Sequence, residues 1–158
     1  MTRPGRMLTA KGIKPIGVKD MTRESFYLYG TVEPDSGGAF IREYDRMSAA
    51  NFQSFLTEFG QAHPVGLHLM TVDGAAIHWA KSLIVPDHVV LLPLPPYCPE
   101  LNPIERFWQE LKRPLTWKNW PSLQAMKDDV WRGFHAWTDE MIQTLTSYRY
   151  ILKAILAI

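Results

Sequence analysis

The chain has 158 residues, a formal net charge of +1 and a single cysteine, Cys98. This length suits one domain with a sizeable core, and the near-neutral charge excludes a globally basic protein that attracts nucleic acid over its whole surface. The lone cysteine excludes an internal disulfide, and no apolar run suits a signal peptide or a membrane span. We therefore expect a cytoplasmic protein, in which any bound nucleic acid would need a local basic face or a separate basic module.

Residues 1–19 contain five basic side chains and no acidic one. We expect them to form a solvated basic arm, and a short strand pair lying on phosphate is the alternative. The folded domain is then expected over residues 20–158.

The next stretch predicts a hairpin followed by a helix. Residues 24–33 and 39–44 have strand-like patterns and flank the turn Pro34-Asp-Ser-Gly-Gly38. Ser48 is placed to cap a helix. The apolar face of this helix comprises Phe52, Phe55, Leu56 and Phe59.

Residues 65–72 then predict an interior strand that ends at Asp73. A turn of small residues and a short helix through His78 follow. A carboxylate at the end of a strand is well placed at the edge of a sheet, where chemistry can take place. The alternative is that Asp73 only caps the next helix, and the sequence alone leaves both open.

A second buried strand is predicted at residues 89–92, and it is followed by a stiff loop with prolines at 93, 95, 96 and 99. Asn102 and Pro103 are typical of the start of a helix. Glu105 falls in the first turn of that helix, where a rigidly held carboxylate suits metal or phosphoryl chemistry. The alternative is a capping box, in which Glu105 bonds the backbone amide of Asn102.

The rest of the chain predicts further helices. The helix that begins at Pro103 is expected to end near Arg113, and Ser122 and Thr138 are placed to cap two more, the last running to Ile155. Basic and aromatic residues alternate in a stretch that suits a DNA backbone, although core aromatics with a solvated basic rim explain it equally well. These residues are Arg106, Lys112, Arg113, Trp117, Lys118 and Trp120.

Two motifs resemble those of a known enzyme family. The stretch Pro95-Pro-Tyr-Cys-Pro-Glu-Leu-Asn-Pro-Ile-Glu-Arg-Phe-Trp108 resembles the signature around the last catalytic acid of mariner-type transposases and their bacterial insertion-sequence relatives, which are DDE superfamily endonucleases. Val72-Asp-Gly-Ala-Ala-Ile-His78 resembles the second-acid motif of the same family. The two acids are 32 positions apart, within the range of the bacterial branch.

The chain departs from the family at two positions. Cys98 stands where Ser or a similar residue is more usual, which we interpret as a tolerated change; a packed thiol is favoured over a nucleophile because no base is placed beside it. Gly74 replaces the usual Asn or Gln, so any role of an amide side chain there is lost.

The resemblance implies an α/β fold of ribonuclease-H-like type, a mixed sheet with flanking helices. It also implies that the first strand is lacking. Leu8-Thr-Ala-Lys-Gly-Ile-Lys-Pro15 resembles the piece that follows the strand with the first catalytic Asp, and no Asp occurs before position 20. We therefore expect a truncated catalytic domain that is inactive alone.

The implied activity is metal-dependent cleavage and strand transfer of DNA, with transposon ends and target as substrates and a homodimer as a possible assembly. Asp73 and Glu105 are the expected catalytic residues and ligands of Mg²⁺ or Mn²⁺, since two such ions activate the nucleophile and stabilise the leaving oxygen. The expected supporting or DNA-contacting residues are His78, Asn102, Arg106 and Lys112. Two alternatives remain: a non-catalytic DNA-binding or dimerising remnant, and an unrelated metal nuclease that shares only the proline-rich loop.

Overall fold

The computed structural model describes residue 11, residues 24–116 and residues 118–155. Contacts divide the chain into two compact units. The strand unit contains residues 26–107 and the C-terminal residues from Thr138, and the helical unit contains residues 108–137. Apart from Lys11, the expected basic arm lies outside the described residues, as does Trp117.

The predicted hairpin is confirmed. Strand β1 (Tyr27–Val32) pairs antiparallel with β2 (Ala39–Tyr44), in a register that joins Tyr27 to Tyr44 and Val32 to Ala39. The turn between them requires a glycine, because Gly37 has a φ of 82°, a region that other residues rarely adopt. Its N–H donates to the carbonyl oxygen of Glu33 at 2.8 Å, which closes the turn.

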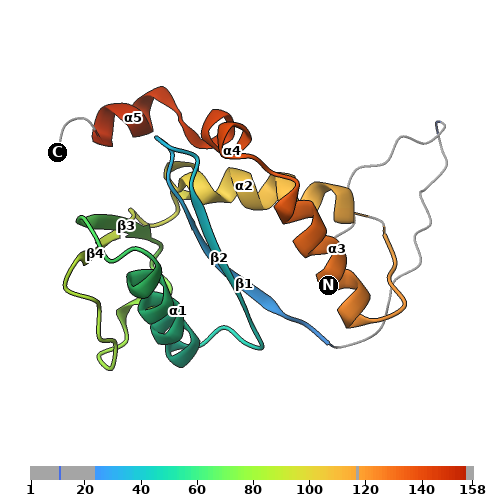
Figure 1. Ribbon diagram of the computed structural model, residues 1–158, viewed down its shortest axis with the longest axis horizontal. Helices are drawn as coiled ribbons and strands as arrows, with labels where there is room; N and C mark the ends of the chain where they lie inside the picture. The colour runs from blue at the N-terminus through green and yellow to red at the C-terminus, as the bar shows by residue number, and fades with distance from the viewer. Residues whose placement is uncertain (1–10, 12–23, 117, 156–158) are drawn as a thin grey trace. The chain divides into compact units, whose positions relative to one another are not determined.

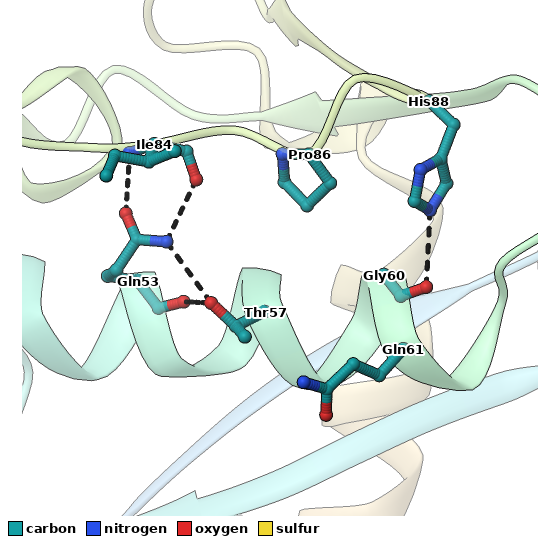
Figure 2. A pocket seen from close by; sticks show the side chains of 7 residues that line it. All are labelled: Gln53, Thr57, Gly60, Gln61, Ile84, Pro86 and His88. Carbon is teal, nitrogen blue, oxygen red and sulfur yellow. Dashed lines mark hydrogen bonds between the residues drawn. The ribbon is translucent and has the colours of Figure 1, made fainter.

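Helix α1 (Ala49–Ala62) lies against both strand pairs and organises the core (Figure 1). Ser48 caps it as predicted, because its hydroxyl accepts the N–H of Asn51 at 3.1 Å. One flank of the helix is tied to the segment before β4: the side chain of Gln53 bonds the backbone of Ile84, and the Gly60 carbonyl oxygen lies 3.2 Å from His88 Nε2 (Figure 2). The predicted apolar face is buried: Phe52, Phe55, Leu56 and Phe59.

Strand β3 (His68–Val72) pairs in parallel with β4 (Val89–Pro93), so the described strands form two separate pairs. The single mixed sheet expected from the sequence is thus divided between the hairpin and the parallel pair. Both pairs nevertheless contribute to one hydrophobic core beneath α1. The buried strand residues of that core are Tyr29, Phe40, Met70, Val72 and Val89.

The remaining described elements are helical. They are the 3₁₀ turns η1 (Ala76–Trp79), η2 (Pro99–Leu101) and η3 (Arg113–Leu115), and the helices α2 (Pro103–Lys112), α3 (Leu123–His135), α4 (Asp139–Thr146) and α5 (Arg149–Ile155). The boundary between the two units falls within α2, after Phe107. None of the helices in the described ranges is long and apolar enough for a membrane span.

The last helix is the clearest error of the sequence prediction. Periodicity predicted one helix from Thr138 to Ile155, but the structure has two, with a break at Ser147 and Tyr148. The Ser147 N–H still donates to the carbonyl of Gln143, but its ψ of 61° turns the chain out of the helix. Thr, Ser and Tyr in sequence are weak helix formers, and the apolar period continues across the break through half-buried Ile151 and Leu152.

Candidate active site

The parallel pairing of β3 and β4 brings their carboxyl ends to one edge of the sheet. The Leu94 N–H donates to the carbonyl oxygen of Val72 at 2.9 Å, so the ladder continues just past β4. Asp73 is the first residue beyond β3. In open α/β sheets, ligands bind outside the carboxyl ends of the strands, and Asp73 therefore lies where a reactive carboxylate is useful.

Asp73 is held by its own turn. Its Oδ1 accepts the N–H of Ala75 at 3.0 Å and lies 2.8 Å from Nδ1 of His78. Its backbone carbonyl accepts the indole N–H of Trp79 at 3.2 Å. The carboxyl side chain remains 64% exposed, and no other described residue bonds Oδ2. One carboxylate oxygen thus positions the side chain, and the other is available to a ligand.

His78 connects Asp73 to the core. Its side chain is only 13% exposed, and the ring packs on Phe52 with 4.5 Å between the ring centroids. A packed imidazole whose Nδ1 contacts the carboxylate restricts the rotamers that Asp73 can adopt. This is the geometry of a positioning residue.

The loop after β4 is stiff and exposed at its tip. Tyr97 has a φ of 60°, which is unusual for a residue with a side chain, and it is 99% exposed. The hydroxyl of Tyr150 in α5 donates to the carbonyl oxygen of Glu100 at 2.6 Å, which fixes the loop within the strand unit. Cys98, in the same loop, is a half-buried free thiol.

Glu105 occupies the first turn of α2, which is anchored by buried Ile104 and Phe107. The N–H of Asn102 donates to the carbonyl of Pro99 at 3.0 Å, so the capping box considered from the sequence does not form there. Asn102 instead supports the turn through its backbone, since its carbonyl accepts the Glu105 N–H at 3.1 Å. Within the described part of the chain, the half-buried carboxyl group of Glu105 has no hydrogen-bond or ion-pair partner.

The two predicted basic contacts lie on either side of the boundary in α2. Arg106 is exposed, and its guanidinium lies 5.2 Å from the ring centroid of Tyr148 in the strand unit. Lys112 is in the helical unit, 6.0 Å from the ring of Trp108. In that unit Lys118 is paired with Asp129 at 2.6 Å, so part of the predicted basic stretch is already neutralised.

The acids suit a hard cation, but the described residues do not complete a site. Carboxylate oxygens are the ligands that Mg²⁺ and Mn²⁺ prefer, and Asp73 Oδ2 and the Glu105 carboxylate have no other described partner. Residues 11, 24–116 and 118–155 contain no group of three or more His, Cys, Asp or Glu side chains placed to hold a metal. The carboxylates of Asp73 and Glu105 are thus available as metal ligands, and the described residues supply no third ligand that would complete a group.

Three features of the candidate site and its neighbouring loop were not predicted from the sequence. Phe52 supports His78, the Trp79 indole fixes the Asp73 carbonyl, and Tyr97 is exposed in a left-handed conformation. Phe52 was predicted only as a core residue, and it does lie in the core. Nothing in the pattern of the proline-rich loop indicates which residue takes the positive φ.

The sequence profile of the DDE superfamily endonuclease family matches residues 1–127. The chain belongs to this family. Among curated relatives, the "Uncharacterized protein y4pE/y4sA" of Sinorhizobium fredii (strain NBRC 101917 / NGR234) is 35% identical over 105 residues, which are 65% of this chain and 73% of that protein. The DDE assignment confirms the resemblance that the two acid motifs indicated.

A solved structure supports the fold. The Mos1 transposase, in its paired-end complex with the left transposon end, matches with a TM-score of 0.69 and 17% identity. The match covers 98% of this DDE chain and 50% of the Mos1 chain, so this chain spans half the length of that relative. The fold is ribonuclease-H-like, as expected.

Proposed function

We propose that this DDE chain is part of a transposase catalytic domain that cuts and joins DNA with divalent metal ions, and that it is inactive alone. The observation that carries this proposal is the pair of available carboxylates in the strand unit. Asp73 follows β3 at the carboxyl edge, and Glu105 opens the helix that the loop after β4 leads to. Both belong to motifs that the family match covers.

In this proposal Asp73 and Glu105 hold Mg²⁺ or Mn²⁺, and the bound ions supply an activated oxygen nucleophile and stabilise the leaving oxygen. The chain's own contribution is positioning. His78 limits the motion of Asp73, and the buried face of α2 limits the motion of Glu105. Inactivity follows because two carboxylates leave the coordination of paired ions incomplete, and the expected first Asp has no counterpart among the described residues.

The proposed partner is DNA, at transposon ends and target sites, with the nucleoid as the cellular location and a homodimer as the assembly. The complex of the Mos1 relative contains a transposon end, which supports DNA as the partner. Exposed Arg106 and Lys112 are the proposed contacts with the DNA backbone, and Asn102 supports the start of α2, where Glu105 lies. Because phosphate contacts release counterions, binding should weaken steeply with salt.

The test is metal-dependent binding of a duplex that carries the element's end sequence. Wild-type protein should bind this DNA more tightly in Mn²⁺ than in EDTA, because bound ions bridge carboxylates and phosphate. The double variant Asp73→Asn, Glu105→Gln should lose that gain but keep the metal-independent binding. An equal gain in both proteins would overturn the proposed metal site.

A second function is favoured by the lack of a three-ligand group in the described residues. A non-catalytic DNA-binding remnant would bind DNA equally with and without metal and would never nick it. Nicking of plasmid DNA by the purified chain, lost in Asp73→Ala, would contradict both this alternative and the inactivity proposed above.

A further inference from the structure

Three histidine side chains gather at the amino-terminal end of the β3–β4 pair. His63 follows the last residue of α1, His68 begins β3 and His88 directly precedes β4. The ring centroid of His68 lies 5.8 Å from that of His63 and 5.9 Å from that of His88. Asp73 follows the opposite end of β3, roughly 16 Å along the strand at the usual rise per residue, so the cluster is separate from the candidate active site.

The backbone brings His68 and His88 side by side. The His68 N–H donates to the carbonyl oxygen of His88 at 2.8 Å, and the Val89 N–H donates to that of Pro86 at 2.9 Å, which turns the chain into β4. Gly60 lets the His88 ring lie against α1, because a Cβ at this position would be 3.0 Å from Cγ of Pro86 and 3.5 Å from Cε1 of His88 (Figure 2). Strand pairing and helix packing therefore fix where both rings lie.

Each of these two rings bonds a backbone carbonyl through Nε2. His68 Nε2 lies 3.2 Å from the carbonyl oxygen of Val65, and His88 Nε2 lies 3.2 Å from that of Gly60 (Figure 2). A carbonyl oxygen can only accept a hydrogen bond, so Nε2 carries the proton in both rings. In a neutral imidazole the other nitrogen, Nδ1, then has a free lone pair. In the described part of the chain, nothing bonds Nδ1 of His68 or His88.

This arrangement is the one that metal-binding histidines use. Such a histidine donates the N–H of one ring nitrogen to a carbonyl or carboxylate oxygen, which leaves the other nitrogen for the ion. With a Zn–N bond of about 2.0–2.1 Å, two imidazole rings that share an ion have centroids about 5–6 Å apart. The centroids of His68 and His88 are 5.9 Å apart, and both rings are half-buried. Their separation and their tautomers thus suit an ion between them.

Aromatic packing alone is the competing explanation of the cluster. The His68 ring meets Phe59 of the core edge-on, with 5.3 Å between the centroids, and the His63 ring lies 4.7 Å from the same phenylalanine. Packing accounts for the position of His68. It does not account for two neighbouring rings that both keep an Nδ1 lone pair without a described partner.

We infer that His68 and His88 bind one borderline transition-metal ion, such as Zn²⁺ or Ni²⁺, through their Nδ1 atoms. Imidazole nitrogen suits these ions, whereas Mg²⁺ and Mn²⁺ prefer oxygen ligands such as the carboxylates of Asp73 and Glu105. The described residues include no group of three ligands in place, so water fills the remaining positions and His63 is not a ligand. The bound ion fastens the start of β3 to the segment before β4. This site does not depend on the proposed function.

The test is calorimetric titration of the untagged 158-residue chain at about pH 7.5, where an ordinary imidazole is mostly neutral. The double variant Asp73→Asn, Glu105→Gln is titrated beside wild type, so that the candidate active site does not add to the stoichiometry. Zn²⁺ and Ni²⁺ should each bind the double variant as one ion per chain with a micromolar Kd. Mg²⁺ and Mn²⁺ should bind it at least about 10-fold more weakly. Zn²⁺ at about 100 times its Kd should raise the Tm by about 5 °C or more.

Histidine-to-glutamine variants in that background show which rings bind the ion. His68→Gln and His88→Gln should each weaken Zn²⁺ binding about 10-fold or more, since either change leaves a single ligand. His63→Gln, beside the site, and His135→Gln, in the helical unit, are the matched controls and should bind like the parent protein. Circular dichroism shows whether each variant folds. His88→Gln carries the test if loss of the ring that packs on Phe59 prevents His68→Gln from folding.

NMR signals of the ring nitrogens test the geometry without any substitution. In the metal-free protein, Nε2 should carry the proton and Nδ1 should be bare in both His68 and His88. Added Zn²⁺ should shift the Nδ1 signals of the two rings together. A proton on Nδ1 of either ring, or Zn²⁺ that shifts only one of them, would overturn the shared site.

Further results separate this site from the proposed function. Zn²⁺ affinity that is unchanged in both His68→Gln and His88→Gln, or that falls equally in the controls, would contradict the two assigned ligands. The gain of DNA binding in Mn²⁺ belongs to Asp73 and Glu105, and His68→Gln should keep it. Absence of that gain beside intact Zn²⁺ binding would remove the proposed function and leave the histidine site standing.

Discussion

Nδ1 of His78 lies 2.8 Å from Oδ1 of Asp73, and the other oxygen of that carboxylate has no described partner. The histidine ring is packed on Phe52 in the core, so its contact with Asp73 limits the motion of this exposed acid. A carboxylate that is immobilised through one oxygen is prepared to bind a ligand through the other. His78 in the short η1 turn therefore fixes one carboxylate oxygen of Asp73 and leaves the other oxygen accessible.

The first prediction concerns this pair. His78→Ala removes a packed ring and a hydrogen bond, and should lower the free energy of unfolding by about 1–3 kcal/mol. Asp73→Asn retains an acceptor oxygen for the ring, and should cost less than about 1 kcal/mol while removing the charge that binds metal. Urea unfolding measures both. Equal destabilisation by the two variants would show that the ring packing contributes little.

The second prediction concerns Glu105. Its carboxyl group has no described partner, so Glu105→Gln should change the free energy of unfolding by less than about 0.5 kcal/mol, mostly through the lost interaction with the helix dipole. Glu100→Gln, in the preceding exposed turn, is the matched control. Both proteins should unfold like wild type, and only Glu105→Gln should lower Mn²⁺ affinity. A large loss of stability in Glu105→Gln would mean that the side chain is structural.

The third prediction compares two glycines with positive φ. A Cβ on Gly37 would lie 1.8 Å from the carbonyl oxygen of Asp139, whereas a Cβ on Gly66 would meet nothing within 4 Å. Gly66→Ala should cost about 1 kcal/mol from the backbone alone, and Gly37→Ala about 3 kcal/mol or more because the turn and the start of α4 must separate. Thermal unfolding measures the difference. Similar costs would contradict the described contact between the β1–β2 turn and α4.

The fourth prediction concerns the proline-rich loop. Tyr97 is fully exposed and has a φ of 60°, so its side chain contributes little to packing while its backbone is strained. Tyr97→Gly should be more stable than Tyr97→Ala by roughly 0.5–1 kcal/mol, because glycine adopts this conformation at little steric cost. Chemical denaturation of the two variants checks this. A less stable glycine variant would indicate that the loop does not hold the left-handed conformation in solution.

The fifth prediction is a pH dependence in the helical unit. The hydrogen bond from Lys118 is the main cause that lowers the pKa of Asp129, and Trp120 and Arg132 also bond this carboxylate. A lowered folded-state pKa means that the stabilisation is fully present above the unfolded-state pKa of about 3.9, and is lost as the pH falls through the folded-state value. The stability difference between wild type and Asp129→Asn should therefore shrink below about pH 4.

The NMR signal of the Trp120 indole N–H reports the protonation of Asp129 independently of the unfolding measurements. Its Nε1–H bonds Asp129 at 3.2 Å, so its chemical shift should follow protonation of the carboxylate and should be insensitive to pH in Asp129→Asn. An indole signal that titrates identically in the two proteins would assign the effect to another group.

Local signals in the sequence predicted most of the elements. Ser48 and Ser122 cap helices as expected, and the Pro34–Gly38 turn closes the hairpin, because caps and turns depend on neighbouring residues. The break at Ser147 was missed because an apolar period continues across it. The division of the sheet was also missed, since strand pairing depends on contacts between residues far apart in the chain.

The candidate site likewise combines features that local sequence signals predicted with features that depend on contacts between distant segments. The acid motifs predict Asp73 and Glu105 as site residues, which stays a prediction, and the strand end and helix start that carry them are confirmed. The capping box was an equally local alternative, but the Asn102 amide bonds Pro99 instead. The packing of His78 on Phe52 joins segments that are separate in the sequence, and no spacing rule could have indicated it.

In the proposed function Asp73 and Glu105 hold divalent metal together, and Mn²⁺ broadening of backbone NMR signals tests this most directly. In the wild-type chain, a low proportion of Mn²⁺ should broaden the amide signals around both acids together, and Asp73→Asn should weaken the broadening at Glu105 as well as at position 73. Broadening around Glu105 that is unchanged in Asp73→Asn, or that never accompanies broadening at Asp73, would contradict a shared ion.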